Sequence, residues 1–298
     1  MILPRKKAAS MCKVCKLLEM DRELVSFLVE HGALPAFKEQ DERISEIEER
    51  LAQRLVRLQV GLESLFIQRL RELGYIPLSI LEQESFIAEI LDPVFADMEE
   101  EIADAAVESA IVARQLTFED IIEQGLELVF MEFSERVLEE LRERVYVFSD
   151  DTFRRIKGDF RATLVRGYEE GKGIDDIAVD LRADFKDLRD HRLQTIARTE
   201  VQGAQNIGIV QTMQDYNVRY KQWLTVRDSR VRGRNPKDRA DHYSLHGQVV
   251  RMDERFSNGL MHPLDRSGPI EEWINCRCRC RPYIPKKGEA ITRTPYYP

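Results

Sequence analysis

Cysteine and arginine alternate near the C-terminus of this 298-residue chain, in the run N-C-R-C-R-C-R at residues 275–281. In an extended conformation, successive side chains point to opposite faces and separate three thiols from three guanidinium groups: Cys276, Cys278 and Cys280 against Arg277, Arg279 and Arg281. The thiol face is apolar enough to pack into a core, and the guanidinium face suits phosphate groups. A flat strand would hold Cys276 and Cys280 about 13 Å apart at Cα, so all three cysteines are not expected to bind one metal ion.

Two histidines upstream of these cysteines could act as metal ligands. His242 and His246 lie four residues apart in H-Y-S-L-H-G, a metal-binding spacing if that turn is helical. With two of the cysteines they define a candidate zinc site: His242, His246, Cys276 and Cys278. No Glu follows His242, so the metalloprotease pattern H-E-x-x-H is absent. Because the spacing between the histidines and the cysteines is irregular, we favour the interpretation that His242 hydrogen-bonds its own turn while the cysteines fill the core. We therefore expect no cofactor and little or no tightly bound zinc.

A basic loop precedes these histidines, at residues 227–239. Its cations outnumber its acidic residues: Arg227, Arg230, Arg232, Arg234, Lys237 and Arg239 against Asp228 and Asp238. Gly233 and Asn235-Pro236 keep the segment irregular, and a flexible basic loop can follow a phosphate backbone without reading base sequence. Together with the arginines of residues 277–281, this loop predicts non-specific contact with double-stranded DNA. The alternative is that these cations only solvate the domain.

Charge is divided unevenly along the chain, whose net charge is −8. From Arg219 onward there are 17 Lys/Arg against 9 Asp/Glu, whereas the first 218 residues hold 28 against 44. A basic C-terminal part on an acidic body suggests that one end of the chain meets a polyanion. Since the longest apolar runs are only a few residues, we expect no membrane partner, no signal peptide and synthesis in the cytosol.

The cysteines fall into two clusters, which does not suit a disulfide framework. In a reducing cytosol they remain thiols or bind metal. Cys12 and Cys15 form a C-x-x-C pair, which is half of a zinc ribbon, and the chain has no second pair. We expect these two small residues to lie on an N-terminal helix.

The residues before Asn217 carry apolar side chains at steps of three and four, the period of amphipathic helices. This period predicts helices at 17–30, 41–73, 79–91, from Asp92-Pro93 onward, and at 117–145, 153–169, 174–188 and 191–215. After Asn217 the period changes to two, which predicts strands at 220–226 and 248–252 and an extended segment at 273–283. The predicted fold class is α+β, with an extended, mostly α-helical N-terminal region followed by a small α+β C-terminal domain.

The polar, cap-rich segment Ser149 to Thr152 is the best candidate boundary. It separates an acidic helical body at 1–148 from a helical lead-in at 149–218. A basic α+β module follows at 219–285, and the Pro-, Gly- and Lys-rich tail at 286–298 is expected to be mobile. Within the lead-in, we expect Arg198-Thr199-Glu200 to form a structural polar network, because no acid–base partner stands at a recognisable spacing.

Five short motifs occur in a fixed order across roughly residues 153–284. They are A-R-T-E at 197–200, W-L-T-V-R-D at 223–228, H-Y-S-L-H-G at 242–247, L-D-R-S-G-P at 264–269 and N-C-R-C at 275–278. In this order they resemble the phage Mu protein F-like domain of phage head-morphogenesis proteins. The resemblance implies structural roles for the motif residues, namely Arg198, Thr199, Glu200, Trp223, Asp228, His242, Leu245, Gly247, Asn275, Cys276 and Cys278. Two departures are a longer segment between Arg232 and His242 than is usual in the family, and Leu264-Asp265 where the family often has Gly-Asp.

The resemblance implies a minor head protein rather than an enzyme. Similar proteins are made in the host cytoplasm and enter the virion in few copies at the portal vertex, and some are implicated in DNA packaging or delivery. We therefore predict that the N-terminal body binds the portal protein or other capsid and scaffold proteins, and that the C-terminal module faces DNA inside the capsid. Two hypotheses compete with this one. The first is a zinc-dependent nucleic-acid hydrolase or transferase that uses His242, Glu200 and the cysteines, and the second is a DNA-binding module with no capsid role.

Overall fold

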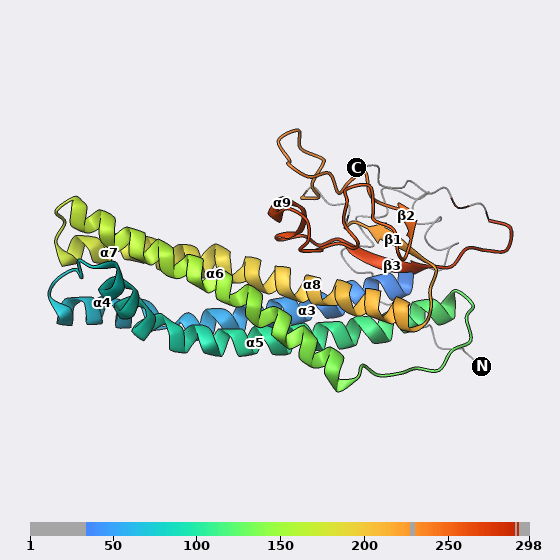
Figure 1. Cartoon of the computed structure of the whole chain (residues 1–298), viewed down its shortest axis with the longest axis horizontal. Helices are drawn as coiled ribbons and strands as arrows, with labels where there is room; N and C mark the ends of the chain where they lie inside the picture. Colours follow the sequence, from blue (N-terminus) through green and yellow to red (C-terminus); the bar gives the residue numbers. More distant parts are fainter. Residues whose placement is uncertain (1–33, 227–229, 290, 292–298) are drawn as a thin grey trace, which may run out of the picture.

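The computed structural model describes residues 34–226, 230–289 and 291. Some predicted features fall outside these residues: the helix at 17–30, the Cys12/Cys15 pair, Arg227, Asp228 and the end of the 286–298 tail. The described chain begins with a long helical bundle, made of α3 (Leu34–Gln59), α4 (Leu62–Leu73), α5 (Ile80–Glu123), α6 (Glu135–Glu169), α7 (Ile174–Asp187), the π-helical turn η1 (Leu188–Arg192) and α8 (Leu193–Asp215). Figure 1 shows the long helices running lengthwise beside one another, with a small sheet lying over one end of α8.

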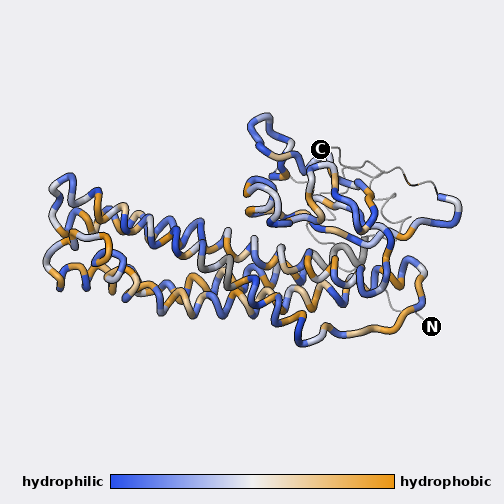
Figure 2. The backbone as a smooth tube through the Cα atoms, viewed as in Figure 1, coloured by the Kyte–Doolittle hydropathy of each residue, from blue (hydrophilic) through white to orange (hydrophobic). Residues whose placement is uncertain are grey.

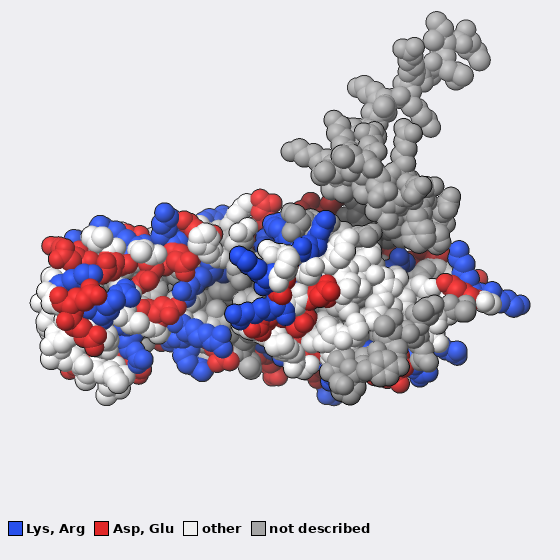
Figure 3. Space-filling model, turned by 90° about the horizontal axis from the view of Figure 1, so that it is seen from above, with Lys and Arg blue, Asp and Glu red and all other residues white. Residues whose placement is uncertain are grey.

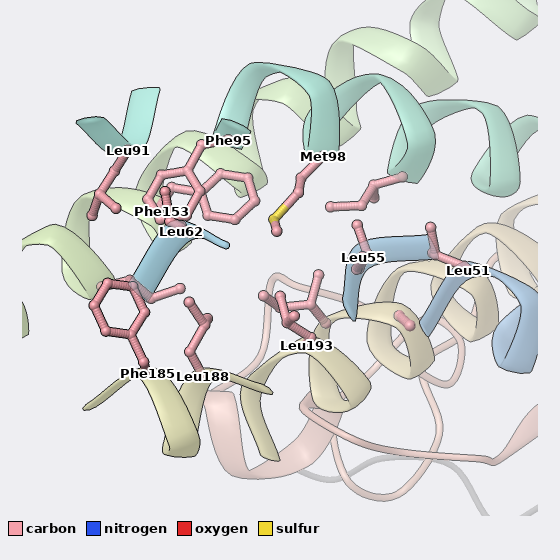
Figure 4. Packing of buried hydrophobic residues seen from close by; sticks show 14 of the residues in the cluster. Leu51, Leu55, Leu62, Leu91, Phe95, Met98, Phe153, Phe185, Leu188 and Leu193 are labelled. Carbon is pink, nitrogen blue, oxygen red and sulfur yellow. The ribbon is translucent and has the colours of Figure 1, made fainter. Parts of the chain in front are cut away.

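A continuous apolar core runs along the bundle. Figure 4 shows side chains from different helices meeting in it, among them Leu55 of α3, Met98 of α5 and Leu193 of α8. Aromatic rings add to this packing: Phe95 stacks on Phe153 with ring centroids 4.3 Å apart. Helices on both sides of residue 149 therefore contribute to one core. The sheet packs against this bundle.

Two glycines interrupt helices that the apolar period predicts as continuous. Gly61 has a φ of +87° and separates α3 from α4 within the predicted 41–73 helix. Gly125 has a φ of +98° and follows the end of α5, so the predicted 117–145 helix stops there and residues 126–134 form neither helix nor strand. The spacing of apolar residues does not show where one residue takes a left-handed backbone conformation. Glycine adopts that conformation without a steric penalty, so a helix can end there.

Three predicted breaks between helices are wrong, because one helix continues through each of them. α5 continues through Asp92-Pro93 and through Thr117, and α6 continues through Ser149–Thr152. Leu91 and Phe95, on either side of Pro93, are both buried in the bundle core. Burial of a continuous apolar stripe outweighs both the local capping preference and the hydrogen bond that a proline removes. The division of the chain at residue 149 into separate parts stays a prediction.

The C-terminal module is built on a three-stranded antiparallel sheet in the order β2-β1-β3. Its strands are β1 (Tyr220–Leu224), β2 (Val249–Arg251) and β3 (Arg279–Tyr283), with Trp223 opposite Cys280 and Gln222 opposite Val249. The predicted extended segment at 273–283 begins instead at the end of a helical turn, α9 (Ile270–Trp273). A second apolar core forms around Trp223. The predicted α+β class is therefore confirmed.

None of the described helices combines the length and the apolar character that a bilayer crossing requires.

Candidate functional site

The A-R-T-E motif lies on α8 and ties the C-terminal module to the bundle. Arg198 donates from Nε to Glu48 Oε1 of α3 at 2.8 Å and from Nη1 to Asn275 Oδ1 at 2.8 Å. Thr199 Oγ1 accepts a hydrogen bond from the backbone N–H of Asn275 at 3.0 Å. These contacts join two helices of the bundle to the segment that enters β3.

Glu200 makes a third tie, through an ion pair with the turn at residues 264–269. Its buried carboxylate accepts from Arg266 Nη2 at 2.5 Å and 2.6 Å. Burial raises the pKa of Glu200, whereas the positive charges of Arg266 and Arg144 act to lower it. Motif-based reasoning missed Arg266, because 66 residues separate it from Glu200 and no local pattern links the two.

His242, Cys276 and Cys278 converge inside the module. Nδ1 of His242 lies 3.4 Å from Cys276 Sγ and 3.5 Å from Cys278 Sγ, and all three side chains are buried. Their ligand atoms lie within 4.8 Å of one another, and the backbone N–H of Cys278 donates to Cys276 Sγ at 3.4 Å. Within the described ranges, these are the residues whose donor atoms lie close enough together to hold a metal ion.

This convergence corrects the flat-strand prediction for residues 275–281. β3 starts only at Arg279, and Asn275 has a φ of +55°, a left-handed conformation that turns the chain just ahead of the first two cysteines. Asparagine tolerates this conformation better than most residues do. Cys280, on β3 itself, is buried outside the group around His242. Strand spacing is therefore no argument against a metal site formed by two of the cysteines.

A carboxylate holds the His242 ring from its other side. Nε2 of His242 lies 3.0 Å from Glu272 Oε2, which also accepts from Asn258 Nδ2 at 2.9 Å. The imidazole packs against the buried indole of Trp223 with ring centroids 5.5 Å apart. In the neutral tautomer whose Nε2–H donates to Glu272, the lone pair of Nδ1 would face the two sulfur atoms. Glu272 and Asn258 are further residues that the sequence motifs did not single out.

The electrostatics of this group favour a positive charge on His242 and a negative charge on Cys276. Burial alone would lower the pKa of His242, but hydrogen bonds to Cys276 and Glu272 raise it to about 9. The hydrogen bond from Cys278 and the contact with His242 together hold the pKa of Cys276 well below its usual value. The pKa of Cys278 rises instead, because it shares its proton with Cys276 and is buried. Cys276 is therefore the thiol of this group that ionises first.

The second predicted histidine ligand lies elsewhere. Nδ1 of His246 accepts from the backbone N–H of Thr225 at 3.1 Å. The turn at 242–247 is not helical, so the four-residue spacing does not bring His246 to His242. Leu245 instead fills the module core, and Gly247, with a φ of +83°, donates its N–H to Trp223 O at 2.8 Å.

The basic loop is held in shape by its own polar groups. Asp238 Oδ2 accepts from the backbone N–H groups of Gly233 at 2.9 Å and Asn235 at 3.1 Å. Arg232 points inward and donates to Ile274 O at 2.5 Å. The remaining described cations of the loop are exposed, namely Arg230, Arg234, Lys237 and Arg239. Figure 3 shows, by contrast, acidic and basic side chains interspersed along the bundle.

The predicted row of three exposed guanidinium groups does not form. Arg279 is only 4% exposed, and Arg281 donates to Asp120 Oδ1 of α5 at 3.0 Å. Arg277 is half-buried. The alternation of side chains is present, but β3 packs against α5 and α8 as well as against β1, so Arg279 is buried and Arg281 is half-buried.

Asn206 on α8 is another residue that the sequence motifs did not identify. Its side chain is buried, and it donates from Nδ2 to Cys278 O at 3.0 Å while Oδ1 accepts from the N–H of Cys280 at 2.9 Å. The Asn206 side chain thus pairs with backbone N–H and C=O groups along the edge of β3, as a neighbouring strand would.

Residues 158–281 match the family model described as "Phage Mu protein F like protein". The comparison with curated proteins and the comparison with solved structures found no match. The matched range begins within α6 and ends in β3, so it includes the whole of α8, β1 and β2 and the first part of β3. The motif residues that meet around Asn275 and His242 all lie inside it.

Proposed function

Because residues 158–281 form a domain of the phage Mu protein F-like family, we propose that the protein is a minor head protein that binds the portal vertex inside the capsid and contacts the packaged DNA. The domain indicates a phage head morphogenesis protein, which is a component of the virion. The family is a structural one, and this supports a non-enzymatic role in assembly, packaging or ejection.

The observation that carries the portal contact is an exposed apolar segment between α5 and α6. This segment, the apolar strap, comprises residues 126–131, and its exposed members are Leu126, Leu128, Val129, Phe130 and Met131. Figure 2 shows it as a hydrophobic run in the connection between the two helices. Single exposed apolar residues are ordinary on protein surfaces, whereas a contiguous group marks a binding surface.

Tyr216 and Arg114 fix the backbone of the apolar strap. The hydroxyl of Tyr216 accepts from the N–H of Met131 at 2.8 Å and donates to Val129 O at 3.1 Å. Arg114 donates from Nε to Met131 O at 2.6 Å. The backbone is therefore held while Val129 stays 82% exposed and the other apolar side chains stay partly exposed. A partner would not have to bear the entropic cost of ordering the segment.

The DNA contact is supported by the exposed cations of residues 230–239. The loop presents them on a shape fixed by Asp238, and it contains no helix that could enter a groove. Recognition of bases requires a helix or ribbon in a groove, so the expected contacts are with phosphate. Arg279 and Arg281 do not belong to this surface, because one is buried and the other is paired with Asp120.

Co-purification of the full-length protein with its portal protein tests the strap. The variant Val129→Asp places a charge at an 82% exposed position and should weaken retention about tenfold or more, as expected for an apolar anchor at an interface. Val60→Asp is a matched control, because Val60 is 76% exposed at the junction of α3 and α4. Equal retention of the two variants would show that the portal is bound through another surface.

A further inference from the structure

We propose that His242, Cys276 and Cys278 bind one zinc ion, which fastens the loop preceding β2 to the chain entering β3. This site goes beyond the head-protein function and does not depend on it. Cys276 lies 34 residues after His242, so the ion would join two segments that no strand pairing connects directly.

The spacing of the donor atoms fits a tetrahedral ion. Zinc lies about 2.3 Å from thiolate sulfur and about 2.0 Å from imidazole nitrogen, so ligand atoms on a tetrahedron are separated by about 3.5 to 3.8 Å. Nδ1 of His242 lies 3.4 Å and 3.5 Å from the two sulfur atoms. The nitrogen therefore already stands at about the distance from each sulfur that bound zinc would impose, and the two sulfurs lie within 4.8 Å of each other.

The surrounding groups have the arrangement that supports a metal-bound histidine and thiolate. Glu272 accepts from Nε2 of His242 at 3.0 Å, which fixes the tautomer that offers Nδ1 to a metal. Asn258 holds the same carboxylate oxygen at 2.9 Å. The N–H of Cys278 points at Cys276 Sγ, where it would stabilise a thiolate. The buried indole of Trp223 lies beside this group, and its Nε1–H interacts with the Cys278 sulfur, where it would favour a thiolate.

Burial argues against the other chemistry that a Cys–His–Glu arrangement suggests. A catalytic thiolate has to be reached by its substrate, whereas Cys276 is 2% exposed and His242 is 1% exposed. A structural metal needs no such access. Two thiolates and an imidazole form a donor set that suits zinc better than the hard cations calcium and magnesium. In the described part of the chain no fourth histidine, cysteine or carboxylate joins the group, which leaves the fourth position to a water molecule.

The ion would also stabilise the basic loop. Arg232 of that loop already donates to Ile274 O, next to the segment that carries the cysteines. Because the free energy of metal binding adds to the free energy of folding, removal of zinc should loosen the module before it affects the bundle.

Zinc content of the full-length protein, purified without chelator and reloaded with zinc chloride, tests the site. We expect one equivalent in the wild type, and loss of that equivalent in Cys276→Ser and in Cys278→Ser. Cys280→Ser is the matched control, because Cys280 is equally buried on the same segment but lies outside the group. The double variant Cys12→Ser, Cys15→Ser should keep the equivalent, which separates this site from any metal held by the N-terminal pair.

A second measurement covers the case in which the cysteine variants fail to fold. Cobalt chloride added to the metal-free wild type should give sulfur-to-cobalt charge-transfer absorption and the strong visible bands of a tetrahedral site. Glu272→Gln keeps a hydrogen-bond acceptor near His242 and should weaken zinc affinity about 10- to 100-fold. A wild type that takes up less than a tenth of an equivalent of zinc, or unchanged zinc in both Cys276→Ser and Cys278→Ser, would overturn the proposal.

Discussion

The helical bundle and the C-terminal module are stabilised in different ways. The bundle buries a long apolar stripe, and most of its described charged pairs lie on the surface, as Arg136 and Glu140 do with side chains 87% and 58% exposed. The pair of Arg114 with Asp215 is a buried exception. The module is smaller, and it is fastened by buried polar contacts from α8, among them Arg266–Glu200 and Asn206 with the backbone of β3. Exposed ion pairs contribute about 0–1 kcal/mol each, whereas a buried polar group left without its partner costs about 1–3 kcal/mol.

This difference matters because most of the family motifs lie at the junction of the two regions. A repeated apolar stripe tolerates apolar substitutions that conserve side-chain volume, since no particular polar atom has to be kept. A buried hydrogen-bonded network needs particular atoms at particular distances. The motif residues of α8 and of the segment before β3 are therefore expected to be sensitive to substitutions that keep size but remove a polar atom.

The largest effect on stability should come from the bundle core. Phe160 is 1% exposed, and its ring centroid lies 4.6 Å from that of Phe185 and 5.6 Å from that of Phe66. Phe160→Ala should lower the free energy of unfolding by about 3–5 kcal/mol, measured by denaturant titration. Val179→Ala, at a 58% exposed position on α7, should change it by less than about 0.5 kcal/mol.

The next effect should come from the ion pair that joins α8 to the 264–269 turn. Arg266→Met keeps much of the side-chain volume but leaves the Glu200 carboxylate buried without its partner. We expect a loss of about 3 kcal/mol, because removal of one member of a buried pair is far more damaging than removal of an exposed one. The exposed pair offers the control, Arg136→Met. A loss below 1 kcal/mol would show that Arg144 or solvent compensates Glu200.

A smaller and more local effect should follow the loss of Asn206. Asn206→Ala leaves the carbonyl of Cys278 and the N–H of Cys280 without their present partner, and should cost about 2 kcal/mol. Hydrogen exchange should rise across β3 and β1 while α3 and α5 keep their protection. Gln211→Ala removes an exposed amide from the same helix and should leave exchange unchanged. Equal loss of protection in the sheet and in α3 and α5 would show that the module and the bundle are not stabilised in different ways.

The smallest effect concerns DNA and should leave stability unchanged. Arg234→Ala with Lys237→Ala removes two exposed cations and should reduce the log–log salt slope of binding to double-stranded DNA by about two, on any sequence. Arg136→Ala with Arg155→Ala makes the same charge change on the bundle and should leave the slope as it is. If both double variants behave alike in the full-length protein, the basic loop serves another partner.

The parts of the structure that follow from local rules were predictable from the sequence. The 3.6-residue period located the helices, and the change to a period of two located β1 and β2. The order of motifs predicted the family model that residues 158–281 match. The period did not reveal where helices break, because Gly61 and Gly125 act through backbone conformation rather than through hydropathy.

The site was harder to predict, because it depends on contacts between residues distant in the sequence. The left-handed turn at Asn275 brings two cysteines to His242, and no alternation rule contains that turn. Burial of Arg279 follows from the helices that pack against β3. Deletion of residues 1–148 would not be a suitable test of the portal contact, since α3 and α5 supply much of the core that supports α8.

We propose that this protein is a head component held at the portal by the apolar strap. Quantitative mass spectrometry of purified, DNA-filled heads tests it most directly, with a phage that carries wild-type protein, Val129→Asp or Val60→Asp. We expect the protein in heads of the wild type and of Val60→Asp, and at least a tenfold lower copy number with Val129→Asp at equal cellular expression. Heads that contain Val129→Asp at the wild-type level, or wild-type heads that lack the protein, would contradict the claim.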